Sequence, residues 1–481
     1  MKFKSRMFSG FFWKLLERCS VSGIHFILQI VLARLLDPEH YGVLAIMLIF
    51  TTVANELIEG GFYTALIQNR DVTEEDYSSV LWLSLAIAAV LYGIIFVTAP
   101  LIASFYSMPD TIVPLRVLSL MLFPGAVNSV LLAKISREMD FKKVFYSSIG
   151  GAVVSGAVGI AIAYLGGGLW ALVVKNLLEV VVMCIVMHFT VRLKLRLAFN
   201  FKRIKVLFSY GWKLLASSLL ETLYNNLSSL VIGKKYDSET LGYYNRGDQF
   251  PQFIINAVNG AVESVILPAM SAEQDENVRV KAIMRNSAMM STYIISPMMA
   301  GLAAIAEPLV SLLLTDKWLP CVPYMQIFCF SMAFYPIHSC NLQAINAMGR
   351  SDLFLKLEII KKVYGIMILA IAVFCFDSPL AIAAVGLIDT CISWFVNAFP
   401  NKKLIGYSYK EQFADVIPLL LISFFMYGSV LLIGHWCAVI GLSDIIILLI
   451  QMAVGMMEYL ILSIIFKPYP YRMLLTMIKK S

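Results

Sequence analysis

The chain has 481 residues, of which 59% are hydrophobic and only 14% are charged, and its mean hydropathy is +0.79. A soluble domain carries roughly 25% charged residues, so this composition excludes an ordinary soluble protein and predicts a membrane protein. The net charge of +7 requires no nucleic-acid partner, because membrane insertion and anionic lipid headgroups both favour basic cytoplasmic loops. The eight cysteines lack metal-ligand spacing, so we expect neither a disulfide framework nor a metal centre.

Apolar stretches follow one another along the whole chain, and each is long enough to span a bilayer as a helix of about 20 residues. The first has no small-residue cleavage site, which predicts a spanning helix rather than a signal peptide. An all-α polytopic membrane protein is expected, with about fourteen helices that start near residues 11, 41, 78, 112, 143, 168, 206, 241, 282, 321, 352, 379, 413 and 442. Within the long stretch 282–314, we expect a kink at Pro297 or Pro308.

Basic residues gather in alternate connections between the predicted helices. If both termini are cytoplasmic, the inside connections include Lys134, Arg137, Lys142, Lys143, Arg192, Lys194, Arg196, Lys202, Arg203 and Lys205. The opposite loops near residues 164, 376 and 435 contain no Lys or Arg. This bias predicts an even number of spanning helices and two cytoplasmic termini.

Two short patterns return after about 200 residues. Trp-Lys-Leu-Leu occurs at 13–16 and again at 212–215. An acid-x-acid-x-x-glycine frame is also repeated, as Asp37, Glu39 and Gly42 and as Asp237, Glu239 and Gly242. Because six helices separate the copies, the repeats share one orientation, which predicts two lobes related by an axis along the membrane normal. The expected divisions are 1–204 with helices 1–6, 205–412 with helices 7–12, and 413–481 with helices 13 and 14.

Polar side chains recur at steps of three or four on the four helices that the repeat relates. They are Lys14, Arg18, His25, Gln29, Asn55, Glu56, Glu59, Lys213, Ser217, Glu221, Tyr224, Asn225, Ser228, Arg246, Gln249, Asn256, Asn259 and Glu263. Charge that faces lipid is costly, so these polar faces are expected to line a water-filled cavity.

Several of these residues have an equally good structural interpretation. Lys14, Arg18 and Lys213 lie near cytoplasmic ends and can reach the headgroups by snorkelling. Arg34 and Arg246 can pair with the acids beside them, and His25 is expected to be a hydrogen-bonded packing residue. The i,i+4 residues Lys175 and Glu179 are expected to neutralise each other.

Glu59 is the acid least easily explained as structural. The stretch "NELIEGGF" places two carboxylates in a long apolar helix beside a Gly-Gly pair. Burial raises the pKa of a carboxyl group and a nearby cation lowers it, so such an acid can take up and release a proton during a transport cycle. We therefore expect Glu59 to couple transport to an ion, with Glu263 as the second candidate.

The absence of nucleotide-binding and hydrolase motifs limits the possible energy sources for transport. The stretch "IGKKYD" at 232 is not a Walker A sequence, and no GxSxG or HExxH motif occurs. No loop is long enough to form a catalytic domain. The sequence therefore predicts neither an enzyme nor a cofactor, and a transport step would use an ion, proton or substrate gradient.

Four stretches resemble a known family. They are "ARLLDPEHYGVLAIMLIF", "EGGFYTALIQNRDVTEEDYSSVLW", "GYYNRGDQFPQF" and "NAMGRSDLFLKLEIIKK". They look like the polysaccharide transporter branch of the multidrug, oligosaccharidyl-lipid and polysaccharide exporters, and most like the colanic-acid-exporter-like lipopolysaccharide biosynthesis proteins. The resemblance runs from about residue 14 to residue 410.

This resemblance implies a flippase in the bacterial inner membrane with a V-shaped pair of six-helix lobes. Its substrate would be an undecaprenyl-diphosphate-linked oligosaccharide that moves from the cytoplasmic to the periplasmic leaflet. Polysaccharide polymerase and chain-length proteins would be its partners. The cations that fit the diphosphate are Arg18, Arg34, Lys213 and Arg246.

Two alternatives remain open from the sequence. A drug or cation exporter of the same superfamily would have an acidic or apolar cavity rather than a basic one. A membrane-embedded polysaccharide polymerase or ligase would act on the same lipid-linked sugar, but it would normally need a sizeable outer loop with catalytic residues.

Overall fold

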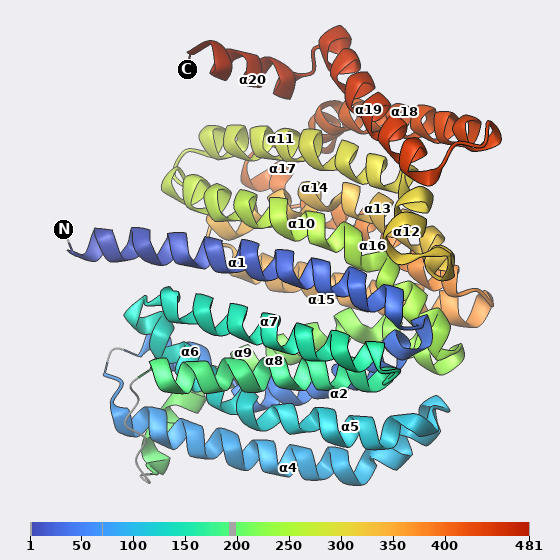
Figure 1. Ribbon diagram of the computed structural model, residues 1–481. Coiled ribbons are helices and arrows are strands. Elements are labelled where there is room, and N and C mark those ends of the chain that lie inside the picture. The colour runs from blue at the N-terminus through green and yellow to red at the C-terminus, as the bar shows by residue number, and fades with distance from the viewer. Residues whose placement is uncertain (1, 70, 192–198, 481) are drawn as a thin grey trace. The chain divides into compact units, whose positions relative to one another are not determined.

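The computed structural model describes residues 2–69, 71–191 and 199–480, and the side chains of 2–9, 11, 210, 257, 259–265 and 477–480 are not among those described. Throughout these ranges the regular structure is helical (Figure 1). The chain forms two compact units, Met1–Gly242 and Tyr243–Ser481. Each unit is described by itself below.

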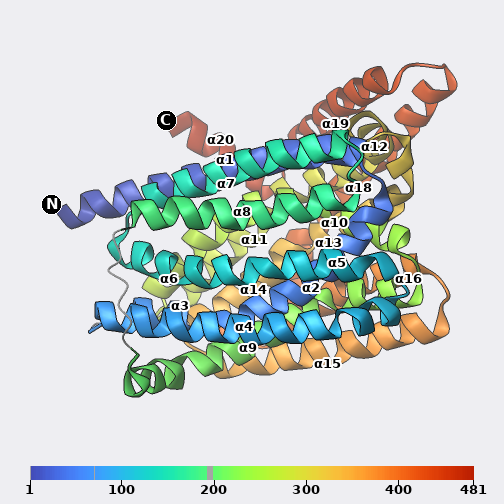
Figure 2. The same ribbon diagram turned by 60° about the horizontal axis from the view of Figure 1, so that its bottom comes forward.

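The first unit is a bundle of long apolar helices joined by short turns. Its helices are α1 (Lys2–Leu35), α2 (Pro38–Glu59), α3 (Phe62–Gln68), α4 (Glu74–Tyr106), α5 (Ile112–Leu118), α6 (Leu122–Glu138), α7 (Phe141–Tyr164), α8 (Leu169–Thr190) and α9 (Phe201–Lys235), followed by the first turn of α10 (Ser238–Ala272). Helix α7 packs against both α1 and α8, as Figure 2 also shows, and α9 packs against α2, α3 and α4. Small residues such as Gly151 and Gly159 allow α7 to approach α8 closely.

The second unit contains most of α10 and ten further helices. These are α11 (Asn277–Ala304), α12 (Ala306–Leu314), α13 (Val322–Ala333), α14 (Tyr335–Ala347), α15 (Ser351–Cys375), α16 (Pro379–Ala398), α17 (Asn401–Leu404), α18 (Tyr409–Val439), α19 (Asp444–Phe466) and α20 (Tyr469–Lys480). Helix α18 packs against α11 and α19, and α13 lies between α11 and α16. A buried amide network joins α14 to α18, since Asn341 and Gln412 exchange hydrogen bonds of 3.2 Å.

The prediction of an all-α polytopic membrane protein is confirmed. Within the described ranges, nine helical segments are long and apolar enough to cross a membrane, or ten if the bent pair α11–α12 counts as one. Each of the fourteen predicted starts falls within or near a helix, although α1 begins at Lys2 rather than near residue 11. The exact number of spans stays a prediction.

The kink expected in the stretch 282–314 lies at Ile305. Helices α11 and α12 meet there at an angle of 68°. Pro308 sits in the first turn of α12, where its missing N–H leaves no hydrogen bond unmade, whereas Pro297 is accommodated inside α11. Of the two prolines, the one near the break is Pro308.

The repeated frame marks equivalent helix ends. Helices α1 and α9 end at Leu35 and Lys235, and α2 and α10 begin at Pro38 and Ser238, all at the predicted offset of 200. The first acid of each frame stands just before the second helix. Asp237 acts as its cap, because Asp237 Oδ1 accepts a hydrogen bond of 2.7 Å from the Thr240 N–H.

The repeated glycines lie where the starts of α2 and α10 cross. A Cβ atom on Gly42 would lie 1.7 Å from the carbonyl oxygen of Ser238, and one on Gly242 would lie 2.1 Å from the carbonyl oxygen of Pro38. The contact is thus reciprocal, and only glycine fits on either side. The wider lobe divisions 1–204, 205–412 and 413–481 stay a prediction.

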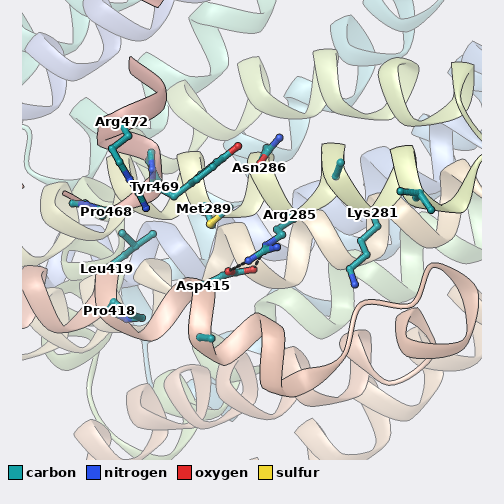
Figure 3. A pocket seen from close by; sticks show the side chains of 14 residues that line it. Lys281, Arg285, Asn286, Met289, Asp415, Pro418, Leu419, Pro468, Tyr469 and Arg472 are labelled. Atoms are coloured by element: carbon teal, nitrogen blue, oxygen red, sulfur yellow. Dashed lines mark hydrogen bonds and ion pairs between the residues drawn. The ribbon is translucent and has the colours of Figure 1, made fainter. Parts of the chain in front are cut away.

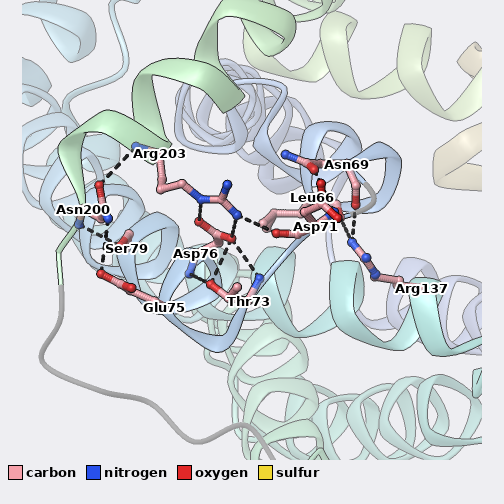
Figure 4. Close-up of polar contacts among 10 residues, drawn as sticks. All are labelled: Leu66, Asn69, Asp71, Thr73, Glu75, Asp76, Ser79, Arg137, Asn200 and Arg203. Atoms are coloured by element: carbon pink, nitrogen blue, oxygen red, sulfur yellow. Dashed lines mark hydrogen bonds and ion pairs between the residues drawn. The ribbon is translucent and has the colours of Figure 1, made fainter.

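The start of α9 is tied to α4 by a polar network (Figure 4). Arg203 binds the buried carboxylate of Asp76 through Nε at 2.8 Å and Nη2 at 2.7 Å. Thr73 caps α4 and also donates to Asp76, and the N–H of Asn200 donates to Ser79. The basic connection 192–205, which we expect to link the two lobes, is only partly described: residues 192–198 lie outside the described ranges, and residues 201–205 begin α9.

Candidate functional site

The end of α2 and the start of α3 form a tight elbow at two consecutive glycines. Gly60 has φ +51° and Gly61 has φ +72°, a left-handed backbone that favours glycine. The elbow turns the chain immediately after Glu59, the last residue of α2. The Gly-Gly pair in the sequence therefore has a backbone role.

Helix α9 touches this elbow through its own glycine. A Cβ atom on Gly61 would lie 2.2 Å from the carbonyl oxygen of Gly211, and one on Gly211 would lie 2.8 Å from the carbonyl oxygen of Gly60. The two backbones are therefore in direct contact. Glu59 and Lys213 each stand two residues from the contact, so the fold brings an acid and a cation from two predicted polar faces to one junction.

Among the described residues, the acids at this junction have no cationic partner. Glu59 accepts a hydrogen bond of 3.0 Å from Asn55 Nδ2, and Glu56 lies one turn before it on α2. No ion pair joins Glu56 or Glu59 to a Lys or Arg in the part of the chain that the structure describes. Lys213 is exposed and likewise makes no ion pair within that part. The expected role of Glu59 as a coupling residue stays a prediction.

The predicted polar face of α9 is partly exposed, since Tyr224 and Ser228 are half-buried. Lys213, Ser217, Glu221 and Asn225 are exposed along successive turns. Asn225 Nδ2 donates to Glu221 at 3.1 Å. This helix therefore presents a cation, a hydroxyl, an amide and an acid in one row.

The other predicted substrate residues differ in exposure. Arg18 and Arg34 are exposed on α1, and Asn55 is half-buried on α2. Asn256 is exposed on α10, where it accepts a hydrogen bond of 3.1 Å from Gln252. The side chains of Asn259 and Glu263 lie outside the described residues.

Arg246 is packed inside the second unit. Its side chain is 4% exposed and lies over the ring of Trp318, with the guanidinium carbon 4.8 Å from the ring centroid. It also donates a hydrogen bond to Gln249. Stacking on an aromatic ring and burial give Arg246 a packing role in this structure.

Three titratable side chains meet between α1 and α8. His25 Nε2 lies 2.9 Å from one oxygen of Glu179, and Lys175 Nζ lies 2.7 Å from the other. The predicted Lys175–Glu179 pair and the hydrogen bond of His25 are both confirmed. Sequence spacing could indicate the pair but not the third member, which comes from another helix.

The second unit contains an apolar groove that the sequence analysis missed. It has a volume of about 610 Å³ and lies between α11, α18 and α19. Its lining includes Met298, Leu302, Ile305, Met452, Met456 and Leu460. The signal was present as "MAVGMMEYL", because flexible methionines are common at adaptable apolar surfaces.

Comparisons with known proteins agree with this architecture. A family model described as polysaccharide biosynthesis protein matches residues 31–323. The succinoglycan biosynthesis transport protein of Rhizobium meliloti is 25% identical over 408 residues, which cover 85% of this chain and 80% of that protein. The lipopolysaccharide biosynthesis protein of Escherichia coli is 22% identical over 442 residues, with 88% of each chain covered.

Solved structures show the same fold. The lipid II flippase in an inward closed conformation superposes with a TM-score of 0.73 at 14% identity, covering 96% of this chain and 99% of that chain. An inward-facing multidrug transporter of the MATE family and MOP superfamily gives a TM-score of 0.64 at 15% identity, covering 82% and 99%. The family model covers more than half of the sequence, and this chain therefore belongs to the polysaccharide biosynthesis protein family.

Proposed function

We propose that this protein is a flippase that moves an undecaprenyl-diphosphate-linked oligosaccharide from the cytoplasmic to the periplasmic leaflet by alternating access. The observation that carries the proposal is that one chain offers both exposed cations and amides on its polar helices and an apolar groove. An amphiphile with a charged sugar headgroup and a polyprenyl tail needs both. Membership of the family and the relatives named for polysaccharide and lipopolysaccharide biosynthesis support the same substrate class.

The exposed cations are assigned first to the diphosphate. Arg18, Arg34 and Lys213 are exposed and would make charge-assisted hydrogen bonds to phosphate oxygens. Arg246 would have to leave Trp318 before it could reach a phosphate, so we assign it a later contact in the cycle.

The amides Asn55, Gln249 and Asn256 would bind sugar hydroxyls. The groove between α11, α18 and α19 would hold part of the tail, because its walls are almost entirely apolar.

The energy for transport is assigned to an ion or proton gradient sensed by Glu59, with Glu263 as the alternative. A carboxylate that has no paired cation is available to a proton or a metal cation as the cavity changes its solvent access. The proposed activity is transport, without a chemical step on the sugar.

The protein would lie in the bacterial inner membrane with both termini in the cytoplasm. Polysaccharide polymerase and chain-length proteins would take over the substrate after it crosses. The charge bias of the loops supports this orientation.

The test is a sidedness assay in proteoliposomes with a fluorescent lipid-linked oligosaccharide whose headgroup is quenched only in the outer leaflet. Lys213→Ala should slow translocation by about tenfold, since one charge-assisted hydrogen bond contributes roughly 1.5–3 kcal/mol. Lys213→Arg should restore part of the rate. The matched control is Lys410→Ala, which removes an exposed cation from the start of α18 in the other unit.

The outcomes separate the functions. Translocation of the lipid-linked sugar that Lys213→Ala slows and Lys410→Ala does not would support the proposal. Transport of organic cations without movement of the lipid would identify a drug exporter, and lengthening of the glycan would identify a polymerase. Either of the last two results would overturn the proposal.

A further inference from the structure

A second pocket in the second unit is lined by cationic and apolar side chains (Figure 3). It has a volume of about 600 Å³ and lies between the first turns of α11, the first turns of α18 and the start of α20. Met289, Pro418 and Leu419 form its apolar part, and Lys281, Arg285 and Arg472 are its cations. Asp415 is the one acid in its lining.

Two of the cations are held rigidly at this pocket. Arg285 makes a bidentate pair with Asp415, with both N···O distances at 2.6 Å. Tyr407 donates a further hydrogen bond of 2.8 Å to Asp415, and burial raises the pKa of its phenol, so it remains a donor. Lys281 binds Glu411 at 2.7 Å and the carbonyl oxygen of Gly406 at 2.8 Å.

These bonds leave donors available. A guanidinium group has five N–H donors, and Arg285 uses two of them on Asp415. Its position is therefore fixed by the fold before any ligand binds, which lowers the entropic cost of binding.

Among the described residues, Arg472 is the pocket cation that has no acidic partner. Its side chain is exposed on α20 and makes no hydrogen bond or ion pair within the described part of the chain. The neighbouring Tyr471 and Leu474 hold α20 in place by packing against the cluster of Met289, Tyr293 and Leu419. The pocket lining thus has three cations against one acid, with the unpaired cation on an anchored helix.

The pocket residues belong to the ends of three candidate membrane-spanning segments. The broken span α11–α12 begins at Asn277, the span of α18 begins at Tyr409, and the span of α19 ends at Phe466, just before the pocket residues Pro468 and Tyr469. Segment ends of this kind meet the headgroup region, where Tyr and Arg are favoured. A phospholipid bound here would place its phosphate beside the cations of the pocket and its acyl chains against the apolar residues.

We propose that this pocket binds the phosphate of an anionic phospholipid from the leaflet at that end of the second unit. Arg472 and the free donors of Arg285 hold the phosphate, and Met289, Pro418 and Leu419 contact the glycerol and upper acyl region. The site is separate from the translocated substrate and does not depend on which substrate the protein moves.

The test measures binding of short-chain dihexanoyl phosphatidylglycerol to the purified full-length protein in neutral detergent. Dihexanoyl phosphatidylcholine and glycerol 3-phosphate are the comparison ligands. Arg472→Gln should weaken phosphatidylglycerol binding about five- to tenfold through loss of one charge-assisted contact, and Arg472→Lys should keep most of it. The matched control is Arg279→Gln, which removes an exposed cation from the same end of α11, where Arg279 pairs with Glu273 and Glu276 outside the pocket.

Each result decides the proposal. Preference for phosphatidylglycerol that is lost in Arg472→Gln and kept in Arg279→Gln supports it. Equal binding by wild type and Arg472→Gln overturns it, as does equal binding of phosphatidylcholine. If glycerol 3-phosphate binds as tightly as phosphatidylglycerol, the site takes a soluble phosphate, and the assignment to a lipid is wrong. Because Arg472 is exposed, its replacement leaves the packing of Tyr471 and Leu474 in place, and an unchanged melting temperature checks this.

Discussion

Replacing Gly42 by Ala tests the crossing of α2 and α10 most directly. The added methyl carbon would lie 1.7 Å from the Ser238 carbonyl oxygen, half of the 3.4 Å at which ordinary contact begins. Both groups belong to the backbone or to the first side-chain atom, so no change of rotamer relieves the clash. The helices would have to separate by about 1.7 Å at this point.

The cost can be estimated from general values. Overpacking costs about 1–3 kcal/mol when side chains can move, and a forced backbone shift belongs at or above the upper end. Alanine regains up to about 1 kcal/mol of helix propensity over glycine. We therefore expect Gly42→Ala to lower the free energy of unfolding by about 2 kcal/mol or more.

Thermal unfolding of the detergent-solubilised protein, followed by circular dichroism, provides the measurement. The matched control is Gly93→Ala in α4, because a Cβ atom there would meet nothing within 4 Å. That variant should be neutral or slightly more stable. Equal melting temperatures for Gly42→Ala and Gly93→Ala would refute the close crossing.

A double variant sharpens the test. If Gly42→Ala already separates the helices, part of the 2.1 Å clash from Gly242→Ala is relieved at the same time. The two losses should then sum to more than the loss in the double variant, as expected for residues that share one contact. Strict additivity would mean that the two glycines do not act at one crossing.

Three further predictions concern other parts of the chain. Asp76→Asn should lower the free energy of unfolding by about 2–3 kcal/mol because it breaks a bidentate pair with a buried carboxylate. Asp352→Asn, in the solvent-screened exposed pair with Arg350, should leave the melting temperature almost unchanged in the same assay. Glu59→Gln should transport without responding to collapse of the proton or sodium gradient, and Glu56→Gln should still respond; a Glu59→Gln protein that slows as much as wild type would move the coupling site elsewhere, with Glu263 next. Gly301→Leu should fill the apolar groove and slow the transport of a full-length polyprenyl substrate but not of a short-chain analogue. Its melting temperature should not change, because the nearest atom to the new Cβ is a Met426 methyl at 3.7 Å. Equal slowing of both substrates would argue against a tail site.

The sequence predicted the long helices well because each has about 20 apolar residues bounded by charge or by turn residues. It missed α3, which is only seven residues long and is separated from α2 by two glycines that looked like part of one helix. It also did not predict α20, whose Tyr471 and Leu474 pack against the cluster of Met289, Tyr293 and Leu419. Short or amphipathic helices gain their stability from contacts that a hydropathy pattern does not contain.

The candidate site, too, could be predicted only in part from the sequence. Spacing identified Glu59 and Lys213 as polar positions on apolar helices, but their meeting depends on a backbone contact between Gly61 and Gly211, which are 150 residues apart in the sequence. The position of Arg246 on a polar helix face predicts a cavity cation, yet its guanidinium group lies over the ring of Trp318, which is distant in the sequence. Local pattern indicates which residues are unusual, and only tertiary contacts decide what they touch.

The reciprocal glycine contact also has an evolutionary consequence. Gly42 contacts the start of α10, and its repeat equivalent Gly242 contacts the start of α2. A reciprocal contact of this kind is typical of an interface between two identical chains related by a twofold axis. A gene duplication that fused two such chains would preserve this self-complementary contact. Each close contact would then limit the substitutions that the other copy could accept. If the two repeats arose in this way, the crossing at Gly42 and Gly242 is the contact that two separate copies would have made with each other.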